Sequence, residues 1–466
     1  MRIISLGASE VIGASCHYIN IGGTGIMIDA GADPEHDGPE ALPALEVLQK
    51  RPDLPVDHVI ITHAHHDHLG SLPVVIQRFP HVQVHMTRTT QTLAAFLLPA
   101  SARLQRRKQR EGSTPFDPLF SEAELEVQDY LHVGHELETP FDVTGTRGSL
   151  EITAAFYDAG HIIGSAGVLF RWHDGEADRS CFFTSDTNPR DQTIIPGGVY
   201  PPGPVDVLML ESTLGADPYA EQTTRRAEEK KLLHRIRTVI DDGGTILIPV
   251  FALGRAQEVL ALIDVAKRRG WIPEDLPVYT AGSQRAIADI YDRTRFSTPR
   301  KSEKFQVWDV RQERLPRGEG GKKEALSKPG IFVVSSGMMF EPTISFELAR
   351  HVMQRAKNAI LLVGYAQEDS PADRLLEAFE AEESVVRLTD KHPPEPLRCH
   401  VEKFRLSGHA NRRDLLKIAE TLQPKHTYLV HGDADAQVWM ADNLVYHHPE
   451  MKVYRNRQGA EIEIAL

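Results

Sequence analysis

The chain has 466 residues, enough for two to four domains, and its 41% hydrophobic and 25% charged residues are typical of a globular protein without a membrane span. Its net charge of −13 argues against general nucleic-acid binding, because contacts to phosphate need Lys and Arg. The three cysteines, Cys16, Cys181 and Cys399, are scattered, which argues against a disulfide framework and favours a reducing, cytoplasmic compartment.

Three short strands are predicted in the first 35 residues, over 3–6, 16–21 and 25–29. The third strand ends at Asp29, and Ala-Gly follows it. Two interpretations of Asp29 stay open: a carboxylate that caps a turn, and one that orients metal ligands from behind.

A dense histidine cluster follows the next predicted strand, residues 57–61. Four His and one Asp fall within residues 63–68. A hydrophobic core gains nothing from such a run, whereas neutral imidazole and carboxylate are the nitrogen and oxygen ligands of zinc. A helix is predicted from Leu69, so the cluster is expected at the carboxyl end of a strand, where α/β sheets bind their ligands.

The spacing within the cluster predicts two neighbouring metal ions. His63 and His65 are two residues apart in extended chain, so their side chains point the same way and can share one metal. Asp67 and His68 come after the turn and face a second direction. His66 lies between these ligands and is expected either to support them or to face solvent.

A helix predicted over residues 88–110 ends in a basic run at 103–110. Shorter basic runs occur at 267–269 and 300–301. Each run has two interpretations, a solvated helix face or a contact to phosphate. Two bound zinc ions would also offset part of the negative charge locally.

Three further polar residues stand where predicted strands end. His161 follows the strand 149–157 on a loop flanked by glycines, as a metal ligand on a tight loop would. Asp186 and Glu211 each end an apolar strand. A capping role would explain either carboxylate alone, but two in succession after a metal motif favour a common site.

Strands and helices alternate between about residues 220 and 363, which predicts βα units and a largely parallel sheet. Residues 295–329 are charged and rich in Gly and Pro, and are expected to form a surface excursion. Strand character returns at about residue 398. Two histidines follow, His409 before a predicted helix and His431 at the end of a strand.

In this order, the residues resemble the motifs of the β-CASP family of metallo-β-lactamase-fold ribonucleases, which includes the cleavage and polyadenylation endonuclease and ribonuclease J. The resemblance covers the whole chain and rests on Asp29, the cluster 63–68, His161, Asp186, Glu211 in Glu-Ser-Thr, His409 in Ser-Gly-His-Ala, and His431. Segments 248–258, 335–339 and 363–367 also look like the family.

The resemblance implies an α/β fold, a metallo-β-lactamase αββα sandwich with an inserted β-CASP α/β domain. The sandwich is expected to be built from residues 1–208 and 398–466. The inserted domain is expected to span residues 209–397.

The resemblance also implies a role for each site residue. One zinc ion would be held by His63, His65 and His161. The other would be held by Asp67, His68 and His431, with Asp186 bridging the two. The family motifs further imply that Asp29 orients the cluster, that Glu211 orients His409 as general acid, and that Ser336 and Arg255 contact the substrate phosphate.

These features together predict a two-zinc ribonuclease that hydrolyses the phosphodiester bonds of single-stranded RNA by a metal-bound hydroxide, with Mn²⁺ as the other metal considered. The resemblance also allows a homodimer and implies no membrane partner. A small-molecule metallo-hydrolase acting on a thioester or lactone is the alternative; the acidic composition favours it, and Glu211 and His409 oppose it. A non-catalytic RNA-binding subunit is opposed by the complete set of ligand positions.

Overall fold

The computed structural model describes residues 1–364 and 366–466, so Tyr365 of the family-like segment 363–367 lies outside the described residues. The chain forms two compact units. The first unit comprises residues 1–190, 197–221 and 409–466. The second comprises residues 191–196 and 222–408.

The first unit contains two sheets of seven strands each. In spatial order the first sheet consists of β22 (Glu461–Glu463), β1 (Arg2–Ser5), β2 (His17–Ile21), β3 (Thr24–Ile28), β4 (His58–Ile60), β5 (Gln83–Thr87) and β6 (His132–His135). The second sheet consists of β21 (Lys452–Arg455), β20 (His426–Val430), β11 (Val207–Glu211), β10 (Asp178–Phe183), β9 (Ala166–His173), β8 (Ile152–Asp158) and β7 (Phe141–Asp142). The strands from β3 to β6 are parallel, and so are those from β10 through β11 and β20 to β21.

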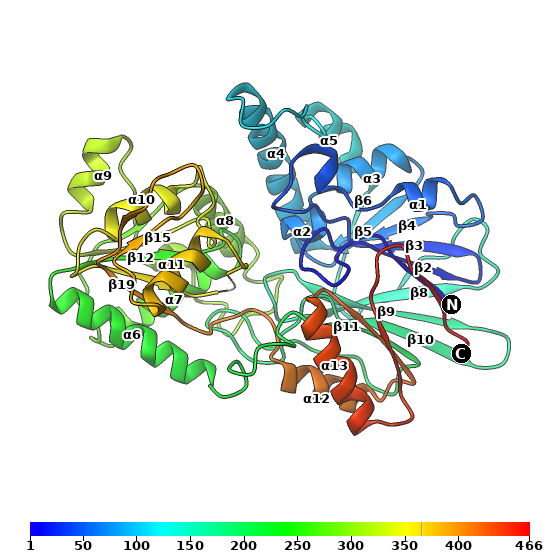
Figure 1. The fold of residues 1–466 in the computed structure, drawn as a ribbon. Helices are drawn as coiled ribbons and strands as arrows, with labels where there is room; N and C mark the ends of the chain where they lie inside the picture. The colour runs from blue at the N-terminus through cyan, green and yellow to red at the C-terminus, as the bar shows by residue number, and fades with distance from the viewer. Residues whose placement is uncertain (365) are drawn as a thin grey trace. The chain divides into compact units, whose positions relative to one another are not determined.

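Helices cover the outer faces of both sheets, as an αββα sandwich requires (Figure 1). The helices of the first unit are α1 (Glu46–Gln49), α2 (His66–Leu69), α3 (Leu72–Arg78), α4 (Arg88–Arg110), α5 (Glu122–Gln128), α12 (Arg412–Leu422) and α13 (Ala434–His447), with short 3₁₀ helices at Gly38–Ala41 and Asp129–Leu131. In Figure 1, α3 and α4 lie against the first sheet, and α12 and α13 lie against the second.

The central strands of the second sheet are buried on both faces, which explains their continuous apolar sequences. In β10, Phe183 packs into the core between the two sheets, while Phe182 packs beneath α12 and α13. In β20, Val430 likewise packs into the core between the two sheets, while Leu429 packs beneath α12 and α13. Because successive side chains alternate between faces, one strand contributes to two hydrophobic layers.

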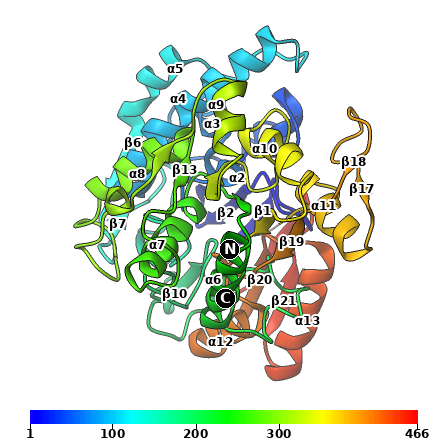
Figure 2. The same ribbon diagram turned by 90° about the vertical axis from the view of Figure 1, so that its left-hand side faces the viewer.

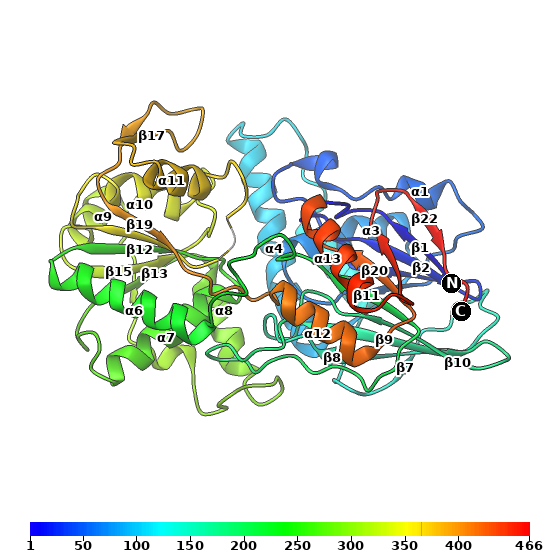
Figure 3. The ribbon, with the colours of Figure 1, turned by 60° about the horizontal axis from the view of Figure 1, so that its bottom comes forward.

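The second unit is a sheet of six parallel strands with helices on both faces (Figures 2 and 3). In spatial order its strands are β14 (Glu313–Arg314), β13 (Val278–Thr280), β15 (Gly330–Val334), β12 (Thr245–Pro249), β16 (Ala359–Leu362) and β19 (His400–Lys403). Its helices are α6 (Arg225–Asp241), α7 (Arg255–Arg268), α8 (Ser283–Arg293), α9 (Glu319–Ala325), α10 (Ile344–Val352) and α11 (Pro371–Glu380). A 3₁₀ helix at Val307–Asp309 and a small hairpin, β17 (Val385–Val386) with β18 (Glu395–Pro396), complete it.

The α/β class and the parallel sheet predicted from the βα alternation are confirmed. The expectation that residues 295–329 form only a surface excursion is wrong in part. β14 joins the edge of the sheet beside β13, and Leu315 and Leu326 are buried in the core. A two-residue strand is too short to produce a recognisable alternation, so the sequence pattern could not reveal it.

The basic run at residues 103–110 forms the exposed end of α4, and acidic side chains pair with it. Arg103 and Arg106 pair with Glu122, Arg107 with Glu111, and Lys108 with Asp37. The solvated-face interpretation of this run therefore fits the structure. No helix among the described residues is both long and apolar enough to cross a membrane.

Phe170 offers a test of the core between the two sheets. Its side chain is fully buried, so Phe170→Ala is expected to lower the free energy of unfolding of the first unit by about 3–5 kcal/mol. The measurement is urea unfolding followed by circular dichroism. Tyr446→Ala on α13 is the matched control, because that ring is 79% exposed and its loss should have little effect. Equal stability of the two variants would contradict the described core.

Candidate metal centre

The polar residues singled out in the sequence gather at one edge of the sandwich, where strands of both sheets end. His63 and His65 follow β4, and Asp67 and His68 lie in α2 directly after them. The remaining residues follow or end strands of the second sheet: His161 after β8, Asp186 after β10, Glu211 at the end of β11 and His431 after β20. Parallel neighbours end at the same edge, so residues far apart in sequence converge.

Seven side chains form two groups whose ligand atoms converge. The first group is His63, His65, His161 and Asp186, and the second is Asp67, His68 and His431. Within each group the ligand atoms lie within 4.8 Å of one another. His66 is exposed and belongs to neither group.

The spacing of these atoms fits a metal. The Nδ1 atom of His65 lies 3.2 Å from Nε2 of His63 and 3.2 Å from Nε2 of His161, and the Nε2 atoms of His68 and His431 are 3.2 Å apart. Ligand atoms of a tetrahedral zinc ion, with bonds of about 2.0–2.1 Å, stand about 3.4 Å apart. Three converging imidazole nitrogens cannot all satisfy one another through hydrogen bonds, whereas a cation satisfies them together.

Asp186 faces both groups through a single carboxylate. Its Oδ2 atom lies 3.6 Å from Nε2 of His63, 3.7 Å from Nε2 of His161 and 3.3 Å from Nε2 of His68. Its Oδ1 atom is buried and lies 3.2 Å from Nδ1 of His431, a member of the second group. Because a buried carboxylate needs compensating positive charge, and this one faces histidines of both groups, Asp186 fits a position between two cations. The chemistry and geometry of these residues therefore fit a metal cofactor.

Asp29 determines which ring nitrogens of two histidines are available. Its carboxylate accepts from Nδ1 of His68 at 2.7 Å, which leaves the Nε2 atom of that ring facing the group. It also accepts from the backbone N–H and the hydroxyl of Thr62, both at 2.9 Å. The single hydroxyl hydrogen of Thr62 is used in this way, so its contact of 3.2 Å with Nδ1 of His63 requires the ring to donate. The Nε2 atom of His63 is then available as well.

The hydroxyl of Thr213 orients His431 by the same logic. It donates to the backbone carbonyl of His431 and lies 3.1 Å from Nδ1 of the same ring. Nδ1 also lies 3.2 Å from the carboxylate oxygen Oδ1 of Asp186, so both neighbours favour a ring that donates through Nδ1. Nε2 is then left for the group formed with Asp67 and His68.

Three of the residues at this edge have left-handed backbone. Asp29, Ser185 and His431 have φ angles of 61°, 57° and 48°. Side chains other than glycine adopt this region at a cost of about 1–3 kcal/mol, and such residues cluster at functional sites. The surrounding hydrogen bonds hold this strained geometry.

The segment before β2 and the loop after β3 hold the His66–His68 turn through their backbone. The backbone N–H groups of Ser15 and Ala30 donate to the carbonyls of Asp67 and His68, at 2.7 Å and 2.9 Å. Gly31 lies so close that a Cβ atom there would stand 1.8 Å from the carbonyl oxygen of Asp67. Only glycine fits this approach, which explains the Asp-Ala-Gly sequence.

The charges of the site suit metal ligation. Burial and the neighbouring His68 hold the pKa of His63 well below its usual range, so the ring is neutral. Burial also lowers the pKa of His68, but Asp186 and Asp29 outweigh it and raise that pKa well above its ordinary value. The carboxylates thus favour positive charge at this place, as a bound cation would supply it.

His409 and Glu211 form a pair beside the two groups. Nδ1 of His409 lies 3.1 Å from Oε2 of Glu211, and its Nε2 lies 3.9 Å from Oδ2 of Asp186. Glu211 is held in turn by the backbone N–H groups of Thr187 and Thr213. Burial lowers the pKa of His409, but Glu211 and Asp186 raise it to about 9, so the ring carries a proton at neutral pH.

Arg255 and Ser336 belong to the second unit, at the carboxyl edge of its sheet. Arg255 opens α7, which follows β12, and Ser336 follows β15, the parallel neighbour of β12. Both side chains carry a buried polar atom without a hydrogen-bond partner among the described residues, Nη1 of Arg255 and Oγ of Ser336. Gln192 accepts from the other terminal nitrogen of Arg255 at 3.3 Å.

Residues that orient the site were not found by the sequence reasoning. Thr62, Thr187 and Thr213 each hold a site residue through a hydroxyl or a backbone N–H group. Each stands within two residues of a site residue in sequence, so position beside a motif was the available signal. Threonine is common on strands, and only the hydrogen bonds distinguish these three.

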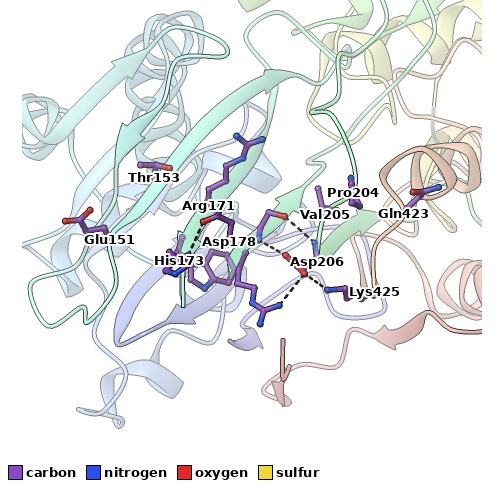
Figure 4. Close-up of a pocket in the computed structure, with 13 residues that line it drawn as sticks. Glu151, Thr153, Arg171, His173, Asp178, Pro204, Val205, Asp206, Gln423 and Lys425 are labelled. Atoms are coloured by element: carbon purple, nitrogen blue, oxygen red, sulfur yellow. Dashed lines mark hydrogen bonds and ion pairs between the residues drawn. The ribbon is translucent and has the colours of Figure 1, made fainter. Parts of the chain in front are cut away.

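A surface pocket of about 650 Å³ lies elsewhere in the first unit (Figure 4). It is lined by residues at the amino ends of β10, β11 and β20, whereas the metal centre follows their carboxyl ends. Its Asp206 pairs with Lys425 at 2.9 Å, and its His173 with Asp178 at 3.1 Å. None of the predicted site residues lines this pocket.

Three family models match successive parts of the chain. They are the metallo-beta-lactamase superfamily over residues 10–153, the Beta-Casp domain over 256–375, and the Zn-dependent metallo-hydrolase RNA specificity domain over 394–453. The chain belongs to the β-CASP family of metallo-β-lactamase-fold proteins. These matches confirm both the family and the fold class that the sequence motifs predicted.

Curated relatives match the β-CASP chain along nearly its whole length. Endoribonuclease YSH1 of Gibberella zeae is 26% identical to this chain, and the match covers 100% of this chain and 57% of the relative. Endoribonuclease YSH1 of Kluyveromyces lactis is 28% identical, and the match covers 98% of this chain and 58% of the relative. Cleavage and polyadenylation specificity factor subunit 3 of Dictyostelium discoideum is 25% identical, and the match covers 100% of this chain and 57% of the relative. The chain thus spans under two thirds of the length of these relatives.

A solved structure supports the fold alone. The crystal structure of a protein of unknown function from Enterococcus faecalis V583 superposes with a TM-score of 0.55 at 13% identity, covering 99% of each chain.

Asp29→Ala tests the orienting role of this carboxylate. Loss of its hydrogen bonds frees the rings of His68 and His63, so the affinity for zinc is expected to fall about 10- to 100-fold. The measurement is a competition titration with a chromophoric zinc chelator. Asp53→Ala is the control, because that exposed carboxylate pairs only with Arg51 among the described residues. Unchanged affinity in a folded Asp29→Ala protein would contradict the orienting role.

Proposed function

We propose that this chain is a metal-dependent endoribonuclease that cleaves single-stranded RNA at a centre of two zinc ions. The observation that carries the proposal is the geometry of the site: two ligand groups both face Asp186, and His409 lies beside them, held by Glu211. The names of the curated relatives and the match to an RNA specificity domain support RNA as the substrate.

In this proposal each side chain has one task. His63, His65 and His161 hold one ion, Asp67, His68 and His431 hold the other, and Asp186 contributes to both. Two zinc ions bound there would lower the pKa of an attacking water and balance the charge of the scissile phosphate.

His409 is the proposed general acid. Hydrolysis adds water across a P–O bond, and the oxygen that leaves the phosphorus must gain a proton. The ring of His409 donates through Nδ1 to Glu211, while its Nε2 faces Asp186 and is positioned to give a proton to the leaving oxygen. Glu211 keeps the ring protonated and fixes its orientation.

Arg255 and Ser336 are proposed as phosphate contacts of the second unit. Each has a buried polar atom that lacks a protein partner among the described residues, and a phosphate oxygen would satisfy both. Arg255 also lies in the first turn of α7, where the backbone favours anions.

The proposal is tested with the purified zinc-loaded chain and single-stranded RNA labelled at either end. Internal cuts are expected, and they should vanish in the double variant Asp67→Ala/His68→Ala. His409→Ala should lower kcat about 10²- to 10⁴-fold with zinc content retained. His173→Ala is the matched control, since that histidine is exposed and pairs only with Asp178 among the described residues.

Two outcomes would contradict the proposal. Release of mononucleotides from one end would mean an exonuclease rather than an endonuclease. Absence of cleavage in a protein that holds its metal would overturn the nuclease function, and ester, thioester and lactone substrates would then be tested.

A further inference from the structure

A basic segment of the second unit stands apart from the acidic chain around it. Residues 283–317 contain nine Lys or Arg and five Asp or Glu, in a chain of net charge −13. The segment runs from α8 through the 3₁₀ helix at Val307–Asp309 to β14 and ends at Arg317. It carries Trp308, a residue that is 38% exposed.

Two arginines of this segment meet at the carboxyl edge of the sheet. Arg314 is the last residue of β14 and pairs with Thr280, the last residue of β13. Arg285 lies in the first turn of α8 and donates from Nη1 to the hydroxyl of Thr280 at 2.7 Å. Because neighbours in register share a face, Arg314 lies on the same side as Thr280, while Glu313 lies on the opposite side with Tyr279.

Trp308 is held rigidly against Arg285. The guanidinium carbon of Arg285 stands 4.6 Å from the centre of the indole ring. The indole N–H donates to Asp289 at 2.5 Å, and the backbone N–H of Trp308 donates to Asp292 at 3.1 Å. The ring is therefore fixed in place before any ligand arrives, which lowers the entropic cost of stacking on it.

Neither of the two guanidinium groups is paired directly with a carboxylate among the described residues. Within the described residues, neither Arg285 nor Arg314 forms an ion pair with Asp or Glu, and no acidic residue lies in the first turn of α8. The charge of Asp289 acts on Arg285 and partly opposes the lowering of its pKa. The carboxylates of Asp289 and Asp292 accept from N–H groups of the Trp308 segment instead. The basic run of α4 differs, because four of its five Arg and Lys side chains pair with acids.

An uncompensated cation at the positive end of a helix is unfavourable, and an anion relieves it. Burial and the charge of Arg314 lower the pKa of Arg285. The place thus combines two guanidinium groups that form no ion pair among the described residues with a rigid, exposed aromatic side chain. This combination binds single-stranded nucleic acid through phosphate and base stacking.

We propose that Arg285, Trp308 and Arg314 form a nucleotide platform for single-stranded RNA. One base stacks on the exposed face of Trp308, and its phosphate binds between the two guanidinium groups. This inference rests on the proposed ribonuclease function and deepens it, because it adds a binding site for a nucleotide within the second unit, built from residues other than the metal ligands and the proposed acid.

The test measures, by fluorescence anisotropy, the binding of fluorescein-labelled single-stranded RNA to the 466-residue, zinc-loaded chain carrying His409→Ala. This variant is expected to cleave the RNA about 10²- to 10⁴-fold more slowly, so that binding can be measured before cleavage. In this background Trp308→Ala is expected to weaken binding about 5- to 30-fold, as loss of one stacked base does. Arg314→Ala is expected to weaken binding and to reduce the salt dependence by about 0.7 in the slope of log K against log salt for the lost phosphate contact.

The controls are matched in residue type. Trp271→Ala removes another exposed tryptophan of the second unit, 41% exposed, from the loop before β13. Arg269→Ala removes an exposed arginine at the end of α7. Neither change should alter the affinity for RNA. Trp308→Phe keeps an aromatic face and is expected to bind within about threefold of the parent.

The outcomes separate the platform from the ribonuclease function. If the parent binds RNA and the wild-type chain cleaves it, but folded Trp308→Ala and Arg314→Ala bind equally well, the platform is overturned and the ribonuclease function stands. If the wild-type chain neither binds nor cleaves RNA, both fail. Binding of a labelled mononucleotide as tightly as the oligonucleotide would overturn RNA as the occupant in favour of a small nucleotide.

Discussion

The buried carboxylate of Asp29 is the interaction on which the metal centre depends. It accepts from the ring of His68 directly and from Thr62, whose hydroxyl in turn meets the ring of His63. One residue thereby sets the available nitrogen on a member of each ligand group. A buried charge of this kind is costly unless it is fully hydrogen-bonded, and here at least three donors meet it. The same carboxylate therefore supports local folding and prepares the ligands.

The sandwich provides the conditions for this arrangement. Strands that are apolar on both faces end together at one edge, and the chain becomes polar only where each strand stops. The left-handed backbone at Asp29, Ser185 and His431 is then stabilised by the packing of the strands behind them. Hydrophobic burial over two layers thus compensates for strain and charge concentrated at a few residues.

The two units use the same principle in different ways. In the first unit the strand ends carry histidines and carboxylates, which suit a metal and proton transfer. In the second unit, arginine and serine residues stand at or after the carboxyl ends of β12, β13, β14 and β15, and such side chains suit phosphate. The parallel strands of both units bring their ligand-binding residues to a carboxyl edge. The net charge of the whole chain, which argued against a nucleic-acid substrate, conceals this local division.

The sequence alone determined the class of fold, the family and the identity of the residues that converge at the metal centre. These followed from local patterns, because strand periodicity and ligand spacing such as that of His63, His65, Asp67 and His68 are properties of neighbouring residues. The short strand β14 was missed, because two residues carry no periodicity. Only the tertiary structure decided which nitrogen of each ring is available, that Asp186 faces both groups, and that Arg285, Trp308 and Arg314 meet. Those facts depend on hydrogen bonds and strand pairing between segments distant in the chain, which leave no pattern along it.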